Sequence, residues 1–204
     1  MNKRLALVLY RLAFAALVLV AVIVQLLHGR DVAGFSTVNY FSFFTIESNV
    51  FGAVMFVVSA IALLQGKTSQ KLAYLRGAAT LYMVVTGLVY SLLLAGADVQ
   101  TPIAWINTVL HYIFPVAILL DWILDRPAKR LSYKKALLWL VFPVVYLAYC
   151  LIRGPLAHNW YPYPFLNVTQ QGYATVAVNS AVIAIAVVLL ALLLTSIPRL
   201  KTKN

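Results

Sequence analysis

Long apolar runs separated by short polar breaks dominate the chain. A helix needs roughly 20 mostly apolar residues to cross the bilayer core, and six segments reach that length. The breaks carry charge or turn residues, as in Gly29-Arg30-Asp31. The pattern predicts an all-α, polytopic membrane protein, a bundle of six transmembrane helices over residues 5–27, 40–64, 72–94, 103–124, 135–152 and 173–197.

Composition agrees with a membrane protein of one domain. Hydrophobic residues make up 63% of the 204 residues and charged residues 10%, whereas soluble domains are about 25% charged. The first apolar run is longer than the core of a signal peptide and lacks a small-residue cleavage site, so it is predicted to be a membrane helix. Because no linker or repeat divides the chain, residues 1–204 are predicted to form a single domain.

The distribution of Lys and Arg predicts the orientation. The breaks that would lie on one side of the membrane contain few cations, namely Arg30 and Arg153. By the positive-inside rule the cation-rich side is cytoplasmic, which places both termini in the cytoplasm. Topology thus accounts for the net charge of +11, and we expect no nucleic-acid partner. The cation-rich side holds Lys3, Arg4, Lys67, Lys71, Arg76, Arg126, Lys129, Arg130, Lys134, Lys135, Arg199, Lys201 and Lys203.

Ionisable groups inside spans are costly and therefore indicate either function or a structural pairing. Arg11 lies close enough to the inner interface for its side chain to snorkel. Asp121 is one turn from the inner end of the fourth span, which favours a structural ion pair. The single cysteine, Cys150, lies in an apolar run, and no metal-ligand spacing occurs. We therefore predict no metal site and no cofactor.

The second span carries a polar stripe. At 100° per residue, Ser42, Thr45, Ser48 and Asn49 share one face of a helix. Such a stripe is typical of ordinary helix packing as well as of a site. Glu47 lies about 200° from Thr45 and should serve a different contact.

The partner of Glu47 is a separate question. An ion pair with Arg11 or Arg30 is one interpretation of this buried carboxylate. A contact with substrate is the other.

The fourth span contains His111, with Asn107 one turn before it on the same face. Both this span and the second run inward from the outer boundary. At 1.5 Å per residue, Thr45 lies roughly 7–8 Å below Tyr40 and His111 roughly 12 Å below Ile103. A hydroxyl and an imidazole at similar depth can meet if the two helices are neighbours, which the sequence alone leaves open.

The outer segment before the sixth span alternates aromatic residues and prolines in WYPYPFLN. Aromatic residues gather at the membrane–water interface, so a simple aromatic belt is one interpretation. The other is a lid over a pocket that opens outward. In that case Arg153 or His158 would meet an anionic headgroup, and Tyr161 and Tyr163 would contact the substrate.

Three motifs in order, YFSFFTIESN, LHYIFPVAILLDWIL and WYPYPFLN, resemble the bacterial branch of the androgen-induced-protein-like family. The animal members of this family include the androgen-induced protein and the androgen-dependent TFPI-regulating protein. They are described as integral-membrane hydrolases of fatty acid esters of hydroxy fatty acids. The resemblance covers nearly the whole chain and implies that Thr45 is the nucleophile and His111 its partner. The WYPYPFLN loop is typical of the bacterial branch, whose substrates need not be those of the animal proteins.

The implied chemistry is physically reasonable. A threonine hydroxyl becomes nucleophilic when a neutral histidine takes its proton. Helical spacing would let Asn107 orient His111, and Asn49 or Ser48 donate a hydrogen bond to the oxyanion. The expected partners are membrane lipids and a lipid or fatty-acyl ester substrate.

Two other functions are compatible with the sequence. In a small transporter or channel, Glu47, Asp121 and Arg11 would be the residues of interest, although the chain shows no duplicated half. In a non-catalytic lipid-binding protein, the polar groups would only stabilise the helix bundle. The expected location is the bacterial plasma (inner) membrane, and no pattern in the sequence indicates an oligomeric state.

Overall fold

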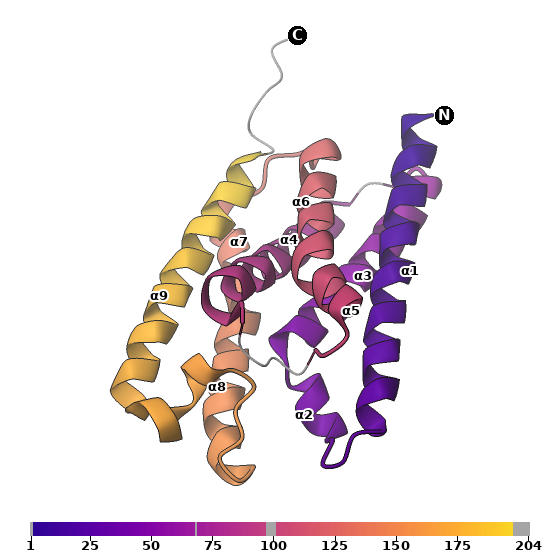
Figure 1. Cartoon of the computed structure of the whole chain (residues 1–204). Coiled ribbons are helices and arrows are strands. Elements are labelled where there is room, and N and C mark those ends of the chain that lie inside the picture. Colours follow the sequence, from indigo (N-terminus) through magenta and orange to yellow (C-terminus); the bar gives the residue numbers. More distant parts are fainter. Residues whose placement is uncertain (1, 68, 97–100, 198–204) are drawn as a thin grey trace.

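The computed structural model describes residues 2–67, 69–96 and 101–197, and in these ranges all regular secondary structure is helical (Figure 1). Six helical segments are long and apolar enough to span a membrane, which confirms the predicted all-α multi-pass fold. Arg199, Lys201 and Lys203 lie outside the described residues. The spans are α1 (Lys3–Arg30), α3 (Phe44–Leu64), Gln70–Leu94, Ala104–Leu124, Tyr133–Leu156 and α9 (Val168–Ser196).

Five of the spans are built from more than one helical piece or are joined to a short neighbour. A short helix, α2 (Thr37–Phe41), precedes α3. The third span is α4 (Gln70–Val89) with a π-helical end, η1 (Tyr90–Leu94). The fourth is α5 (Ala104–Thr108), a π-helical turn η2 (Val109–Ile113) and α6 (Phe114–Leu124). The fifth is α7 (Tyr133–Ala136), η3 (Leu137–Leu140) and α8 (Val141–Leu156), and a short turn, η4 (Pro164–Leu166), leads into α9.

The first residues of α1 and the last residues of α9 lie at the same end of the bundle (Figure 1). Near this end, Arg4 donates a hydrogen bond to the carbonyl of Leu64, where α3 ends. The indole of Trp122 in α6 donates to the carbonyl of Leu194 in α9. The chain therefore crosses the bundle in alternating directions, while the cytoplasmic assignment of this end stays a prediction from charge.

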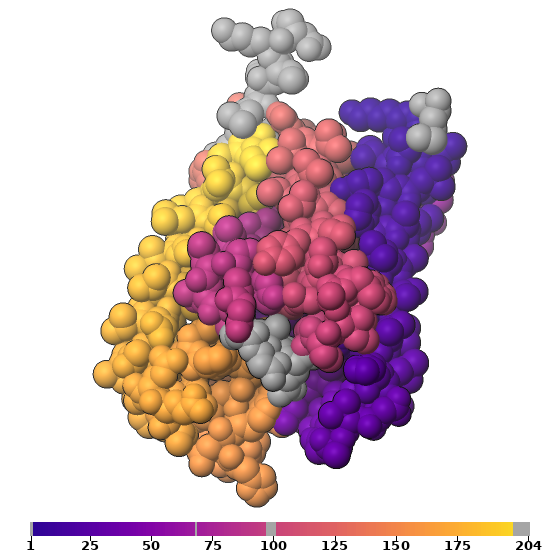
Figure 2. All heavy atoms as spheres, viewed as in Figure 1, coloured from indigo at the N-terminus to yellow at the C-terminus, as the bar shows by residue number. Residues whose placement is uncertain are grey.

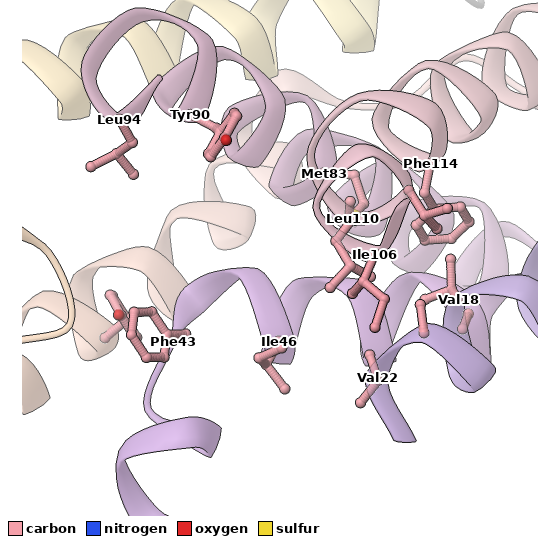
Figure 3. Packing of buried hydrophobic residues seen from close by; sticks show 14 of the residues in the cluster. Val18, Val22, Phe43, Ile46, Met83, Tyr90, Leu94, Ile106, Leu110 and Phe114 are labelled. Carbon is pink, nitrogen blue, oxygen red and sulfur yellow. The ribbon is translucent and has the colours of Figure 1, made fainter. Parts of the chain in front are cut away.

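The core lies between α1, α3, α4 and the α5–η2–α6 span, and α8 and α9 are less buried. Val18 and Val22 of α1 face Ile106 and Leu110 of the fourth span (Figure 3). Small residues allow close helix approach, which matters in membranes because lipid supplies no hydrophobic drive between helices. Figure 2 shows α1 along one edge of the molecule and α9 along the other.

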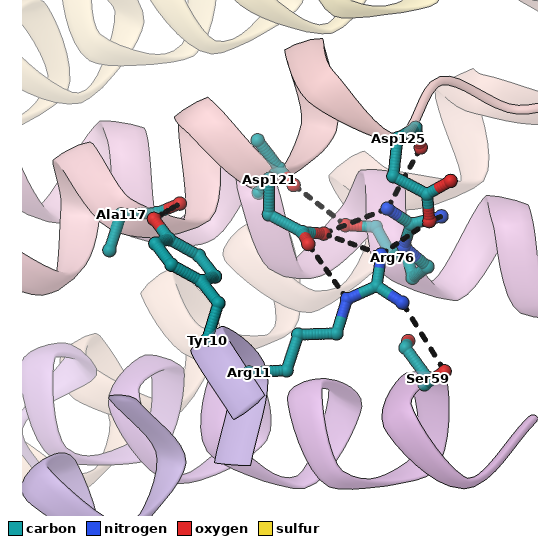
Figure 4. Close-up of polar contacts among 8 residues, drawn as sticks. Tyr10, Arg11, Ser59, Arg76, Ala117, Asp121 and Asp125 are labelled. Carbon is teal, nitrogen blue, oxygen red and sulfur yellow. Dashed lines mark hydrogen bonds and ion pairs between the residues drawn. The ribbon is translucent and has the colours of Figure 1, made fainter. Parts of the chain in front are cut away.

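An ion cluster ties three spans together (Figure 4). Arg11 of α1 contacts Asp121 at 2.7 Å and also Asp125. Arg76 of α4 contacts Asp121 at 2.7 Å and Asp125 at 3.1 Å. Arg11 is 1% exposed, so the expectation that it snorkels is wrong: two carboxylates hold it inside the bundle. Asp121 forms the expected ion pair.

The second span begins later than predicted. The sequence suggests one helix from Tyr40, but α2 ends at Phe41 and α3 starts at Phe44. At the break, the hydroxyl of Ser42 donates back to the carbonyl of Val38, and Phe43 is extended. Ser42 therefore leaves the predicted stripe, and Thr45 becomes the second residue of a new helix.

Candidate functional site

Thr45 and His111 lie side by side although they come from the second and fourth spans. Thr45 Oγ1 is 3.4 Å from His111 Nε2, and the side chains are 8% and 2% exposed. The second and fourth spans are therefore neighbours at this depth, which the sequence had left open. A hydroxyl and an imidazole in contact inside a membrane protein are a candidate nucleophile and base.

The second ring nitrogen of His111 fixes the direction of this contact. Nδ1 lies 3.1 Å from the backbone carbonyl oxygen of Asn107. A carbonyl only accepts, so the hydrogen-bond network assigns the proton of the neutral ring to Nδ1. The lone pair of Nε2 then faces the hydroxyl of Thr45, as required of a general base.

Asn107 acts differently from the prediction. The sequence suggested that it orients the imidazole, and its carbonyl contacts the ring, but its side chain serves Tyr90. Nδ2 of Asn107 donates to the Tyr90 hydroxyl at 2.6 Å. The Tyr90 ring stacks on His111 with centroids 3.9 Å apart and planes 20° apart. The imidazole is thus held in its plane by a ring contact as well as by a hydrogen bond.

His111 and Tyr90 both lie in π-helical turns, η2 and η1. Such turns are rare and occur frequently at functional sites, because the i→i+5 pattern changes the direction of side chains. Here the two turns face each other across the stacked rings. No feature of the sequence indicated them.

Tyr163 completes a chain of hydroxyls at Thr45. Its phenolic oxygen is 3.2 Å from Thr45 Oγ1 and accepts a hydrogen bond from the backbone N–H of Thr45 at 3.2 Å. The Tyr163 O–H can therefore donate to Thr45, whose own hydroxyl donates to His111. Burial raises the pKa of Tyr163 to about 12, which keeps the phenol protonated. We refer to Thr45, His111 and Tyr163 as the hydroxyl–imidazole site.

The start of α3 explains why these tyrosines gather. The first N–H groups of a helix lack partners within the helix and carry the positive end of its dipole. Phe43, at the N-cap, supplies no side-chain hydrogen bond. Instead the N–H of Phe44 donates to the Tyr146 hydroxyl at 3.2 Å, and Tyr146 donates to the carbonyl of Ser42 at 2.9 Å. Tyr146, which the sequence reasoning missed, and Tyr163 thus cap α3 from α8 and from the following loop.

Ser48 and Asn49 are used for packing near the site. Asn49 Nδ2 donates to the carbonyls of Thr45 at 2.8 Å and Leu110 at 3.2 Å. Ser48 Oγ is 2.9 Å from the hydroxyl of Thr86. Both residues therefore join α3 to its neighbouring helices. The Tyr163 hydroxyl, 3.2 Å from Thr45 Oγ1, and the backbone N–H of Thr45 are the candidate donors for an oxyanion.

The loop residues separate into two groups. Tyr163 reaches the site, while the Tyr161 ring is buried against Gly154, where an added Cβ would lie 2.1 Å from that ring. Arg153 donates to Asn39 Oδ1 at 2.6 Å and lies over the Trp160 ring, 5.0 Å from its centroid. His158 is exposed. Arg153 therefore fastens the loop to α2 and α8.

Glu47 forms no ion pair with any described residue, and its Oε2 is buried without a hydrogen-bond partner among them. Arg11, one partner considered for it, is engaged by Asp121 and Asp125. The suggested Arg11–Glu47 pair is wrong.

An apolar cavity of about 140 Å³ begins at Thr45. It extends between α4, α8 and α9, and Tyr146 and Tyr163 line it at the end near Thr45. A smaller hollow of about 20 Å³ touches both Thr45 and His111 and is also lined by Gln25, Tyr40 and Thr101. A single water needs roughly 10–15 Å³ and polar neighbours, and this hollow provides both.

No model of a protein family, no curated protein sequence and no solved structure matches this chain. Within residues 2–67, 69–96 and 101–197, no group of three or more His, Cys, Asp or Glu side chains could hold a metal ion. The chemistry open to this site is therefore argued from its own hydroxyls, imidazole and backbone groups.

Proposed function

We propose that this protein is an intramembrane hydrolase of lipid esters in which Thr45 is the nucleophile and His111 the general base. The observation that carries the proposal is the contact of Thr45 Oγ1 with the Nε2 of an imidazole whose Nδ1 donates to the Asn107 carbonyl. The Thr45 hydroxyl, the His111 imidazole and the Asn107 carbonyl then form the chain of nucleophile, base and orienting acceptor that acyl transfer uses.

The resemblance to the androgen-induced-protein-like family supports the same pair of residues. It assigns the nucleophile to Thr45 and the base to His111, and it assigns fatty-acyl esters as the substrate class. With both termini cytoplasmic, the site faces the outer leaflet, and the proposed location is the bacterial plasma membrane.

The first half of the reaction forms an acyl-enzyme. Thr45 Oγ1 attacks the ester carbonyl carbon while its proton passes to His111 Nε2. The carbonyl oxygen becomes an oxyanion, which the Thr45 N–H and the Tyr163 hydroxyl are placed to stabilise. The bond to the alcohol oxygen then breaks, and His111 gives its proton to that oxygen, releasing the alcohol.

The second half returns the free enzyme. A water in the small hollow beside His111 loses a proton to Nε2 and attacks the acyl carbon. The bond from that carbon to Thr45 Oγ1 breaks, and Oγ1 regains its proton from His111. The fatty acid leaves, so one ester and one water yield one alcohol and one acid.

Fluorophosphonate labelling of the purified protein in detergent tests the proposal. We expect labelling of the wild type at Thr45 and no labelling of Thr45→Ala or His111→Ala. Thr108→Ala and His28→Ala are matched controls, because both side chains are exposed and should leave labelling unchanged. Labelling that persists in a folded Thr45→Ala variant would contradict the assignment of the nucleophile.

The transporter alternative is tested with the same preparation. Reconstituted in liposomes, a protein that moves ions or solutes would show flux that depends on Glu47, Asp121 or Arg11. We expect no such flux, since Asp121 and Arg11 neutralise each other within the ion cluster.

A further inference from the structure

The cavity beside Thr45 follows one face of α9. Ser180, Ile183, Ala184 and Val187 line it, and their spacing of three, four and seven residues is that of a single helical stripe. From Ser180 to Val187 this stripe covers roughly 10 Å along the helix. The cavity is thus an elongated space that leads away from the nucleophile along the helix axis.

The cavity is open on the side of α8 and α9. Val144 of α8 lines it although its side chain is 62% exposed, and Ala184 of α9 is also exposed. Deeper in the bundle the lining is closed, since Val187 of α9 is 3% exposed and Val85 of α4 is 8% exposed. Because α8 and α9 are membrane spans, an opening between them leads into lipid.

The lining selects for a hydrocarbon chain. Most side chains along the cavity are aliphatic or aromatic, and Thr45, Tyr146 and Tyr163 form a cluster of hydroxyls at one end. The other hydroxyl groups in the lining belong to Thr86, Tyr90 and Ser180. Its volume of about 140 Å³ is close to that of an engineered apolar cavity, about 150 Å³, that stays dry and binds benzene. An extended chain covers roughly 1.2 Å per bond, so this space takes the first eight or so carbons of an acyl group.

We propose that this cavity is the binding site for the acyl chain of the substrate, which enters sideways from the bilayer between α8 and α9. The inference rests on the proposed function, since it places the ester carbonyl at Thr45. The acyl chain stays in the cavity after the alcohol leaves, and the small hollow on the other side of Thr45 is then left for the hydrolytic water. Carbons beyond the cavity extend through the opening into lipid.

Chain-length dependence of labelling tests the site. Ala184→Phe should narrow the cavity and slow labelling by a fluorophosphonate with a long alkyl chain about tenfold or more, because each lost methylene contact alone is worth about tenfold. Labelling by a methyl-substituted fluorophosphonate should not change. Ile185→Phe is the matched control, since Ile185 is the next residue, is 62% exposed and does not line the cavity.

If Ala184→Phe slows both probes equally, or slows neither, the acyl-chain assignment is overturned. A second measurement separates this inference from the catalytic one. In Thr45→Ala, a fatty acid with a photoreactive diazirine should crosslink to α8 and α9, and Ala184→Phe should reduce the yield severalfold. Crosslinking confined to other helices would sink the binding site, even if labelling of Thr45 itself succeeds. If the wild type is never labelled by fluorophosphonate but crosslinking occurs at α8 and α9, the acyl-chain binding site is supported and the hydrolase proposal is contradicted.

Discussion

Two buried polar regions lie in this protein, the ion cluster of Arg11, Arg76, Asp121 and Asp125 and the hydroxyl–imidazole site. In the ion cluster, contacts of 2.7 Å engage both arginines with Asp121, and none of these three residues lines the cavity or the small hollow beside Thr45. At the hydroxyl–imidazole site the contacts are 3.2–3.4 Å, and cavities adjoin Thr45 on two sides.

The difference is the one expected between polar groups that stabilise a membrane protein and polar groups that form a site such as the one proposed. Charges taken out of water are tolerated when each finds its partner, and such a saturated cluster has no capacity left for a ligand. A reactive group must instead keep an open direction and looser contacts, which often tighten only when the substrate binds. Depth in the membrane alone, which is all that the sequence provides, does not distinguish the two cases.

The largest expected effect comes from removing the nucleophile. Thr45→Ala should lower ester hydrolysis by about 10⁴-fold or more, because the nucleophile and its base act as one unit. Its thermal stability should stay close to that of the wild type, since only the contacts to His111 and Tyr163 are lost. Hydrolysis of a fluorogenic ester, measured beside thermal unfolding, checks both statements. Substantial residual hydrolysis would place the catalytic centre elsewhere.

Breaking the ion cluster should lower the stability of the fold and leave the labelling rate unchanged. Asp121→Ala leaves Arg11 and Arg76 to share Asp125, and removing one partner of a buried pair costs about 3–5 kcal/mol. Unfolding in detergent is the measurement, and Asp31→Ala, at an exposed position, is the control. The labelling rate of the fraction that remains folded should equal that of the wild type. An unchanged stability, or a selective loss of labelling, would contradict the assignment of a purely structural role to the ion cluster.

Tyr163→Phe sharpens the comparison within the site. The substitution removes the hydroxyl beside Thr45 while the ring still packs against Phe43 and Phe165. Loss of one oxyanion donor lowers kcat by about 10²-fold or more, with little change in KM. Tyr149→Phe is the control, because its hydroxyl contacts Ser42 and not Thr45. A change in KM alone would mean that Tyr163 contributes to substrate binding and not to stabilisation of the oxyanion.

The smallest effect is expected at Asn107. Asn107→Ala removes the hydrogen bond to Tyr90 but keeps the backbone carbonyl that binds His111 Nδ1. One hydrogen bond is worth about 0.5–1.5 kcal/mol, which corresponds to a loss of activity of about twofold to tenfold. Steady-state hydrolysis measures this loss. A defect as severe as that of His111→Ala would show that the side chain, and not the carbonyl, orients the imidazole.

Sequence reasoning predicted the six spans because long apolar runs and charged breaks are local properties of the chain. It also placed Thr45 and His111 at similar depth from the helical rise alone. It missed the break between Phe41 and Phe44, since residues 40–49 contain no glycine or proline that would mark the end of a helix. The break depends on Tyr146 and Tyr163, which accept the freed N–H groups from more than 100 residues away in sequence.

The supporting groups of the site were harder to predict for the same reason. Asn49 and Ser48 lie on the correct face, but packing against Leu110 and Thr86 engages them. The Asn107 carbonyl carries no sequence signal, because every residue has one. The π-helical turns under Tyr90 and His111 are set by tertiary packing, and no local pattern in these segments marks them.

The capping of α3 by two tyrosines has a consequence for biosynthesis. Ribosomes make the chain from its N-terminus at about 5–20 residues per second, so the spans that carry Thr45 and His111 are inserted before Tyr146 and Tyr163. During that interval the first N–H groups of α3 lack their hydroxyl partners. The hydroxyl–imidazole site, with Tyr163, is therefore complete only when the last third of the chain has been inserted. A translation product cut short after α6 would contain Thr45 and His111 but neither of the two tyrosine hydroxyls that cap α3.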